Sequence, residues 1–220
     1  MPSLSEKYRP KILDELVGET PTAVARMVRM WKNDGGVSSM PNLLFYGTPG
    51  TGKTTTALCL ANELDCDYIE VNASDDRGID SMRQIVQTTR YKAFNPIGGK
   101  IVILDEADGI THEAQAMLRR PMERSGETRF IVVANEIRNI ISPIISRCVV
   151  FEFTLFLEDI KRRISKIADI EGMDVDEYTI EDVARESDGD LRKAIGELEK
   201  TLIVENLKLN EIVKQYRCRS

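Results

Sequence analysis

A glycine-rich segment of eight residues has the spacing of a phosphate-binding loop. It fits the pattern G-x-x-x-x-G-K-[ST] and reads Gly47-Thr48-Pro49-Gly50-Thr51-Gly52-Lys53-Thr54. Glycine allows backbone angles that turn successive N–H groups inward, and a helix N-terminus adds about half a positive charge beside a polyphosphate. We expect Lys53 to reach the β- and γ-phosphates of a nucleotide and Thr54 to hold Mg²⁺ through its hydroxyl.

The residues on either side of this segment test that interpretation. The alternative is a glycine-rich turn with an incidental lysine. Residues 42–46 are mostly apolar and predict a short buried strand, whereas residues 55–64 predict a helix. A strand before the glycines and a helix after them are the context that a phosphate-binding loop requires. The flanks therefore favour a nucleotide site.

A second group of reactive side chains follows an apolar strand. Residues 100–108 contain an unbroken apolar run over 101–104 and end in carboxylates, and such a run is typical of a strand in a parallel sheet covered by helices on both faces. Such sheets bind ligands at the carboxyl ends of their strands. There Asp105 would help to hold the hydration shell of Mg²⁺, and Glu106 would orient or deprotonate an attacking water. The alternative, an acidic turn after a core strand, loses weight because the two motifs complete one site.

Asn135 and Arg192 are further candidates. Asn135 ends a predicted buried strand over residues 128–135, where its amide could polarise the attacking water or the γ-phosphate, or could simply begin a turn. Arg192 lies in the first turn of a helix capped by Asp190. A cation at that position opposes the helix dipole unless an anion is nearby, so Arg192 is a candidate anion ligand.

A predicted helix over residues 79–92 carries two stripes. The apolar one predicts a core contact, and the polar one contains Arg83, Gln87 and Arg90 at spacings of four and three residues. Periodicity alone favours a solvated face for the polar stripe, because exposed Arg and Gln are common on helices. DNA binding is the functional alternative.

Composition limits the remaining possibilities. The 220 residues carry a formal net charge of −6, which argues against wrapping nucleic acid with the whole surface but leaves room for a local basic stripe. Four cysteines without C-x-x-C spacing and a single histidine do not favour a zinc site. No apolar run is long enough to span a bilayer, and the N-terminus lacks the apolar core of a signal peptide. We therefore expect no membrane partner and a cytosolic or nuclear protein.

The predicted elements divide into two domains. Strand and helix signals alternate up to residue 154, which predicts an α/β domain with a parallel sheet over residues 1–154. Strand signals then stop. Residues 155–220 predict a small all-helical lid with four helices, over about 157–169, 176–186, 190–203 and 208–216.

With these motifs assembled, the chain resembles the small subunits of replication factor C, the AAA+ sliding-clamp loader of archaea and eukaryotes. The resemblance runs from Tyr8 to about Leu202. Phosphate loops occur in many ATPases and GTPases, so the other marks and their order make the match specific. Those marks are Tyr8-Arg9-Pro10, Asn72-Ala73-Ser74-Asp75, Asp105-Glu106-Ala107-Asp108, Leu118-Arg119-Arg120, Ser146-Arg147-Cys148 and Gly189-Asp190-Leu191-Arg192.

This resemblance implies an AAA+ P-loop ATPase that uses ATP and Mg²⁺. Lys53, Thr54, Asp105 and Glu106 match the catalytic core, with the metal at Thr54 and Asp105. Asn135 matches sensor 1 and Arg192 matches sensor 2. Arg147 resembles the arginine finger that serves the ATP site of a neighbouring subunit, where such a residue can contribute about 10³–10⁵ in rate. The resemblance also places near the nucleotide Tyr8, Arg9, Val17, Gly18 and the loop from Gly47 to Thr55.

The implied partners are other clamp-loader subunits, large and small, the sliding clamp and primer-template DNA. Arg83 and Arg90 match the family's DNA-facing helix, and this favours the DNA-binding reading of their stripe. Tracking of phosphates would give salt-sensitive affinity with little sequence preference. The loop over residues 94–97 resembles part of the clamp-facing surface.

The chain departs from the family at its end. Family members continue into a third helical domain that forms an oligomeric collar, whereas this sequence stops at Ser220. A fragment and a natural short form both remain open. Two other functions also remain as alternatives: a non-catalytic assembly or DNA-binding module of a loader, and another AAA+ DNA-processing ATPase such as a branch-migration motor.

Overall fold

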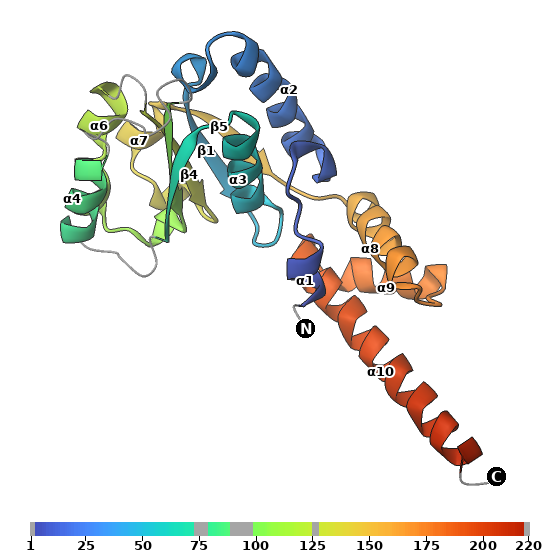
Figure 1. The fold of residues 1–220 in the computed structure, drawn as a ribbon. Helices are drawn as coiled ribbons and strands as arrows, with labels where there is room; N and C mark the ends of the chain where they lie inside the picture. Colours follow the sequence, from blue (N-terminus) through green and yellow to red (C-terminus); the bar gives the residue numbers. More distant parts are fainter. Residues whose placement is uncertain (1–2, 73–78, 89–98, 125–127, 218–220) are drawn as a thin grey trace. The chain divides into compact units, whose positions relative to one another are not determined.

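The chain forms two compact units. A computed structural model describes residues 3–72, 79–88, 99–124 and 128–217 (Figure 1). One unit is Pro10–Thr154, and the other combines Met1–Arg9 with Leu155–Ser220. We expected residues 1–9 to lie with the sheet. In the structure Leu4 is instead buried in the apolar core of the helical unit, so this segment lies with the helices.

The first unit is built on a parallel sheet in which β4 lies between β1 and β3. The described residues form five strands in the order β2-β3-β4-β1-β5, and every neighbouring pair is parallel. The predicted α/β fold with a parallel sheet covered by helices is confirmed. The strands are β1 (Asn42–Gly47), β2 (Asp67–Asn72), β3 (Lys100–Asp105), β4 (Thr128–Ala134) and β5 (Cys148–Phe153).

Helices cover both faces of this sheet because its central strands are apolar on both sides. In β1, Leu43 and Phe45 pack with α2 (Glu19–Asn33) and α3 (Lys53–Glu63). Leu44 points to the other face, as alternation along a strand requires. That face is covered by α4 (Ile79–Thr88), α5 (His112–Met117), α6 (Arg119–Arg124) and α7 (Ser142–Ile145), and Figure 1 shows α4, α6 and α7 on the side of the sheet away from α2 and α3.

Short 3₁₀ turns complete the first unit, and one of them follows the carboxylate strand. They are η1 (Leu13–Glu15), η2 (Gly36–Ser39), η3 (Ala107–Gly109) and η4 (Ile137–Asn139). The turn η3 brings Asp108 back toward the end of β4 by folding the chain immediately after β3.

The second unit contains α1 (Leu4–Lys7), α8 (Leu157–Glu171), α9 (Glu177–Glu186) and α10 (Leu191–Arg217). Its core is aliphatic and includes Leu4, Ile160, Ile164, Ile167, Ile180 and Leu198. Two separate helices were predicted over 190–203 and 208–216, which is wrong because α10 is continuous. The intervening residues 204–207 contain neither Gly nor Pro, the residues that interrupt helices. Among the helices of the described residues, none combines the length and apolar character needed to cross a membrane.

Candidate nucleotide-binding site

The phosphate-binding loop lies between β1 and α3, as predicted. Gly47, Gly50 and Gly52 have φ values of +140°, +73° and +89°, a region that favours glycine. Gly47 also pairs with Phe153 of β5, and a Cβ added there would lie 2.2 Å from the Phe153 carbonyl oxygen. Thr51 is buried and donates a hydrogen bond of 2.9 Å to the Thr48 carbonyl, which closes the turn.

Lys53 is the first residue of α3 and is only 6% exposed. Its Nζ donates hydrogen bonds of 2.8 Å to the carbonyl oxygens of Gly47 and Thr48. A buried ammonium needs such acceptors because leaving water is costly. The contacts fold the side chain back over the loop, so that its charge lies beside the inward-facing backbone where phosphates would bind.

Thr54 and Asp105 meet although 51 residues separate them. The Thr54 hydroxyl lies 2.9 Å from Oδ2 and 3.1 Å from Oδ1 of Asp105. A hydroxyl and a carboxylate are hard oxygen donors, and Mg²⁺ in nucleotide sites takes few protein ligands, completing its shell with water and phosphate. The two side chains therefore fit a Mg²⁺ site. In the described part of the chain, no cluster of three or more His, Cys, Asp or Glu could hold a metal alone.

Glu106 follows Asp105 in a left-handed backbone conformation. Its φ is +52°, which is uncommon for a residue with a side chain, and its N–H donates a 3.0 Å hydrogen bond to Oδ1 of Asp105. Unusual backbone angles occur often at functional sites. Glu106 is exposed, and its backbone is hydrogen-bonded to the carboxylate that faces Thr54.

Asn135 lies at the same edge of the sheet, because it follows β4 and β4 lies between β1 and β3. Its backbone N–H donates a 3.2 Å hydrogen bond to Oδ1 of Asp108. No role for Asp108 was predicted from the sequence. Its place in the cluster of carboxylates that follows the apolar strand is the signal that could have found it.

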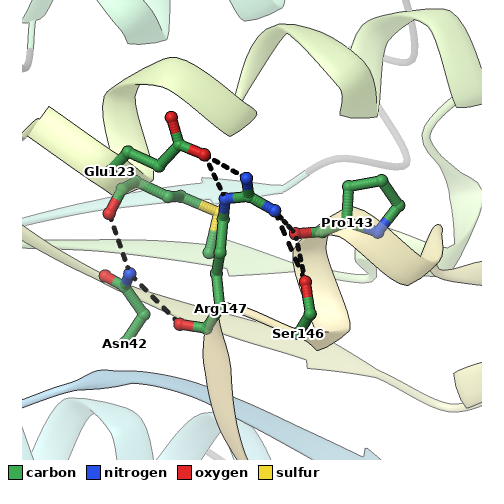
Figure 2. A network of polar contacts seen from close by, with 6 residues as sticks. Asn42, Glu123, Pro143, Ser146 and Arg147 are labelled. Carbon is green, nitrogen blue, oxygen red and sulfur yellow. Dashed lines mark hydrogen bonds and ion pairs between the residues drawn. The ribbon is translucent and has the colours of Figure 1, made fainter.

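Arg147 lies at the amino ends of the strands, whereas the phosphate loop lies at their carboxyl ends. It precedes β5, whose first residue, Cys148, pairs with Asn42 at the start of β1. From Asn42 to Gly47, β1 spans about 16 Å at roughly 3.3 Å per residue. Arg147 therefore lies a strand length away from the phosphate loop of its own unit. Figure 2 shows its guanidinium bound to Glu123 of α6, with a further hydrogen bond of 2.5 Å to the Pro143 carbonyl.

Asn42 fixes the backbone at this edge. It is 8% exposed, and its Nδ2 donates to the carbonyl oxygens of Met122 at 3.2 Å and Arg147 at 3.4 Å. Its Oδ1 accepts a 3.0 Å hydrogen bond from the N–H of Phe130 (Figure 2 labels Asn42 and Arg147). The buried side-chain amide of Asn42 thus connects the start of β1 to three other segments: α6, strand β4 and the residue that precedes β5.

Three predicted site residues belong to the helical unit. The Tyr8 hydroxyl donates a 2.7 Å hydrogen bond to Oε1 of Glu171, and the Tyr8 carbonyl accepts one of 2.6 Å from Arg163. Arg9 directly follows it, and Arg192 is an exposed residue at the start of α10. The structure thus holds Tyr8 against α8.

The remaining predicted residues lie in the α/β unit. Val17 and Gly18 directly precede α2, and Thr55 is on α3. On α4, Arg83 and Gln87 are exposed. Of the predicted apolar stripe, Met82 is buried and Val86 is partly buried, and the neighbouring Ile85 is buried as well. Two expectations lie outside the described residues: DNA binding by Arg90, and clamp contact by residues 94–97.

A protein-family model and curated relatives both match this chain. Residues 43–155 match the model of the ATPase family associated with various cellular activities (AAA). The replication factor C small subunit of Thermofilum pendens is 46% identical over 94% of this chain and 65% of its own length. That of Archaeoglobus fulgidus is 44% identical over 88% of this chain and 62% of its own length. The chain thus spans less than two thirds of each relative.

Solved structures share the fold. A RuvB Holliday junction branch migration motor of Thermotoga maritima superposes with a TM-score of 0.72 at 24% identity, covering 87% of this chain and 64% of its own. A RuvB variant from the same organism gives a TM-score of 0.75 at 22% identity, covering 87% and 64%. The predicted resemblance to replication factor C small subunits is confirmed by the sequence matches. This chain belongs to the AAA family of ATPases.

Proposed function

We propose that this chain is an ATPase subunit of a sliding-clamp loader, which couples ATP binding and hydrolysis to loading a ring-shaped clamp onto primer-template DNA. The hydrogen bond between Thr54 and Asp105 carries the proposal, because it joins the phosphate loop to the carboxylate strand in one site. Similarity to replication factor C small subunits in several archaea supplies the loader context.

In this proposal the residues around the phosphate loop have separate roles in nucleotide binding, Mg²⁺ binding and hydrolysis. Gly47 to Thr55 hold the triphosphate through backbone N–H groups, and Lys53 turns its Nζ from the loop carbonyls to the β- and γ-phosphates. Thr54 and Asp105 hold Mg²⁺, which neutralises charge that develops on the phosphates. Glu106 orients the attacking water or removes its proton, and Asn135 aligns that water or the γ-phosphate.

The helical unit and the turn before α2 complete the nucleotide's surroundings. Tyr8, Arg9, Val17 and Gly18 lie near the adenine and the phosphates in this proposal, and Arg192 contacts the γ-phosphate from α10. Arg9 and Arg192 add positive charge that a triphosphate attracts.

Arg147 acts on a neighbouring chain. The length of β1 separates it from its own phosphate loop, and this supports a role as an arginine finger supplied in trans. One chain is then half of a working site. Turnover requires a second subunit that presents Arg147 to the first one's γ-phosphate.

The exposed face of α4 is the proposed DNA contact. Arg83 and Gln87 are exposed there, and Arg90 continues the same stripe in the sequence. An arginine stripe that tracks phosphates suits an acidic chain, because the contact needs only a few positioned cations. Other loader subunits and the sliding clamp complete the set of partners. Fold similarity to RuvB at 22–24% identity gives no support to branch migration.

ATP turnover per chain, measured against chain concentration with primer-template DNA present, tests the shared site. A rate per chain that rises with concentration is expected if chains complete one another's sites. When Arg147→Ala chains are mixed into wild type, the fractional loss of ATP turnover should then exceed the fraction of variant chains, because each variant chain also inactivates the site of a neighbour. A loss that is only proportional to the doped fraction would contradict the trans role.

A further inference from the structure

The guanidinium of Arg147 is occupied by groups of its own chain. Its Nε and Nη2 both donate to Oε1 of Glu123, with an Nε distance of 2.9 Å. Nη1 donates to the Pro143 carbonyl at 2.5 Å and approaches Oγ of Ser146 at 3.4 Å (Figure 2). The Nε–Nη2 edge is one of the edges with which arginine grips carboxylates and phosphates in pairs of hydrogen bonds. In the single chain Glu123 holds that edge.

The ion pair with Glu123 restrains only the guanidinium group of Arg147. Asn42 binds the Arg147 carbonyl and the Met122 carbonyl, and this anchors the backbone on both sides of the ion pair. The Arg147 side chain is 25% exposed, whereas that of Glu123 is 47% exposed. Exchange of the carboxylate for another anion therefore needs side-chain rotation and no movement of the sheet.

The face around Glu123 is strongly basic. Within α6, Glu123 is surrounded by Arg119, Arg120 and Arg124, all exposed. The hydrogen bond from Arg147 lowers the pKa of Glu123 below its ordinary value, and the charges of Arg119 and Arg124 add to this effect. Glu123 is thus the only carboxylate of α6, and it lies among three arginines of that helix and pairs with Arg147, in a chain whose net charge is −6. Such a face fits an anion with more charge than one carboxylate.

We propose that Glu123 is an internal counter-ion for Arg147, and that the triphosphate held by a second, nucleotide-loaded copy of this chain replaces it at the interface. This rests on the proposed role of Arg147 in trans. A guanidinium that is paired with a carboxylate of its own chain does little to stabilise the negative charge that develops on a γ-phosphate. The ion pair with Glu123 must therefore break before Arg147 can act. An exposed ion pair is weak, and a triphosphate offers more negative charge and more acceptors.

The consequence is selective assembly. A neighbour without nucleotide offers no anion to exchange for Glu123, so Arg147 stays paired within its own chain. A neighbour with ATP binds the Arg147 guanidinium through its triphosphate. This contact strengthens the interface and raises the rate of ATP hydrolysis. The preference for nucleotide-loaded neighbours thus comes from the triphosphate, and Glu123 weakens that contact by the free energy of the ion pair that must be broken.

Two defective chains that complete each other give a direct test. The acceptor carries Arg147→Ala and keeps its phosphate loop, whereas the donor carries Lys53→Ala and keeps Arg147. ATP turnover of a fixed acceptor concentration is measured against donor concentration. Adding Glu123→Gln to the donor should lower the half-saturating donor concentration about two- to five-fold, the size expected from releasing an exposed ion pair. The matched control, Glu113→Gln on α5, changes net charge equally and should leave that concentration unchanged.

The outcomes separate the two proposals. A donor carrying both Lys53→Ala and Arg147→Ala should support no turnover; if it matches the single variant, or if no mixture turns over ATP, the trans role fails and this inference with it. If Arg147 is required but Glu123→Gln leaves the half-saturating concentration unchanged or raises it, the counter-ion role is wrong and the trans role stands. Should Lys53→Ala fail to fold, Asp105→Asn replaces it in the donor.

The pairing can also be measured in the isolated chain. Phenylglyoxal modifies unpaired guanidinium groups, and mass spectrometry gives its rate at Arg147. The rate should rise several-fold in Glu123→Gln and stay at the wild-type value in Glu113→Gln. Equal rates in wild type and Glu123→Gln would overturn the proposal.

Discussion

The hydroxyl of Thr54 lies 2.9 Å from Oδ2 of Asp105, which joins the end of the phosphate loop to the end of β3. If this pair holds Mg²⁺, Thr54→Ala should bind ATP equally with and without Mg²⁺, whereas wild type should bind more tightly with it. Titration of a fluorescent ATP analogue in Mg²⁺ and in EDTA measures the difference. Thr54→Ser keeps the hydroxyl and should behave as wild type. A full Mg²⁺ effect in Thr54→Ala would contradict the assignment.

Lys53→Ala should weaken ATP binding about 10- to 100-fold, because it removes a charged hydrogen-bond donor worth roughly 1.5–3 kcal/mol. The same titration gives the dissociation constant. Lys100 is a suitable control, since it is also 6% exposed but begins β3 at the edge of the sheet opposite Asp105. Lys100→Ala should leave ATP affinity unchanged. Near-normal affinity in Lys53→Ala would refute the phosphate-loop role.

Gly47→Ala and Gly52→Ala should differ in stability. A Cβ at Gly47 would meet the backbone of β5 at 2.2 Å, whereas one at Gly52 has no neighbour within 4 Å. Overpacking of this kind costs about 1–3 kcal/mol beyond the backbone strain that both positions share. Urea unfolding should therefore show Gly47→Ala to be the less stable variant. Equal stabilities would mean that β5 moves aside at little cost.

Asp108→Ala should lower ATP turnover several-fold while ATP affinity stays near wild type. The reason is that Asp108 accepts the backbone N–H of Asn135 and so fixes the residue proposed to align the γ-phosphate or the water. Steady-state turnover in mixtures containing functional Arg147, together with nucleotide titration, separates the two effects. Asp108→Asn retains an acceptor oxygen and should recover most of the rate. Parallel losses in both variants would point to charge instead of position.

The contact of the N-terminal segment with α8 should depend on pH. Hydrogen bonds from Lys7, at 2.6 Å, and Tyr8 lower the pKa of Glu171 below its ordinary value of 4.5. A carboxyl whose folded pKa is depressed stabilises the fold above its unfolded pKa and loses that contribution as pH falls through the folded value. Glu171→Gln should thus be less stable than wild type at neutral pH.

The difference in urea midpoint between wild type and Glu171→Gln should shrink as pH falls below about 4.5, where the wild-type carboxyl takes up a proton. At the alkaline end, the pKa of Lys7 is raised from 10.5 by the same contact, so its contribution is full below that value and is lost above it. Glu158→Gln, on the same helix, controls for general charge effects. A midpoint difference that is constant from neutral to acidic pH would show that Glu171 does not act through its charge.

Local sequence determined the elements that carry the chemistry. The predicted strand over 42–46, the loop and the following helix appear as β1, the phosphate loop and α3, because glycine spacing and apolar runs act over a few residues. Local patterns failed where breaks are subtle. The two helices predicted over 190–203 and 208–216 are one continuous helix, α10.

Tertiary structure decided which residues meet. Thr54 contacts Asp105, Asn135 contacts Asp108, and Arg147 contacts Glu123 only because β4 inserts between β1 and β3 while β5 adds to the outer edge of β1. Periodicity reports whether a residue is buried, but strand order depends on pairings between segments far apart in the chain. The sequence by itself therefore determined the phosphate loop and its neighbouring carboxylates as separate motifs, and the order of the strands assembled them into one site.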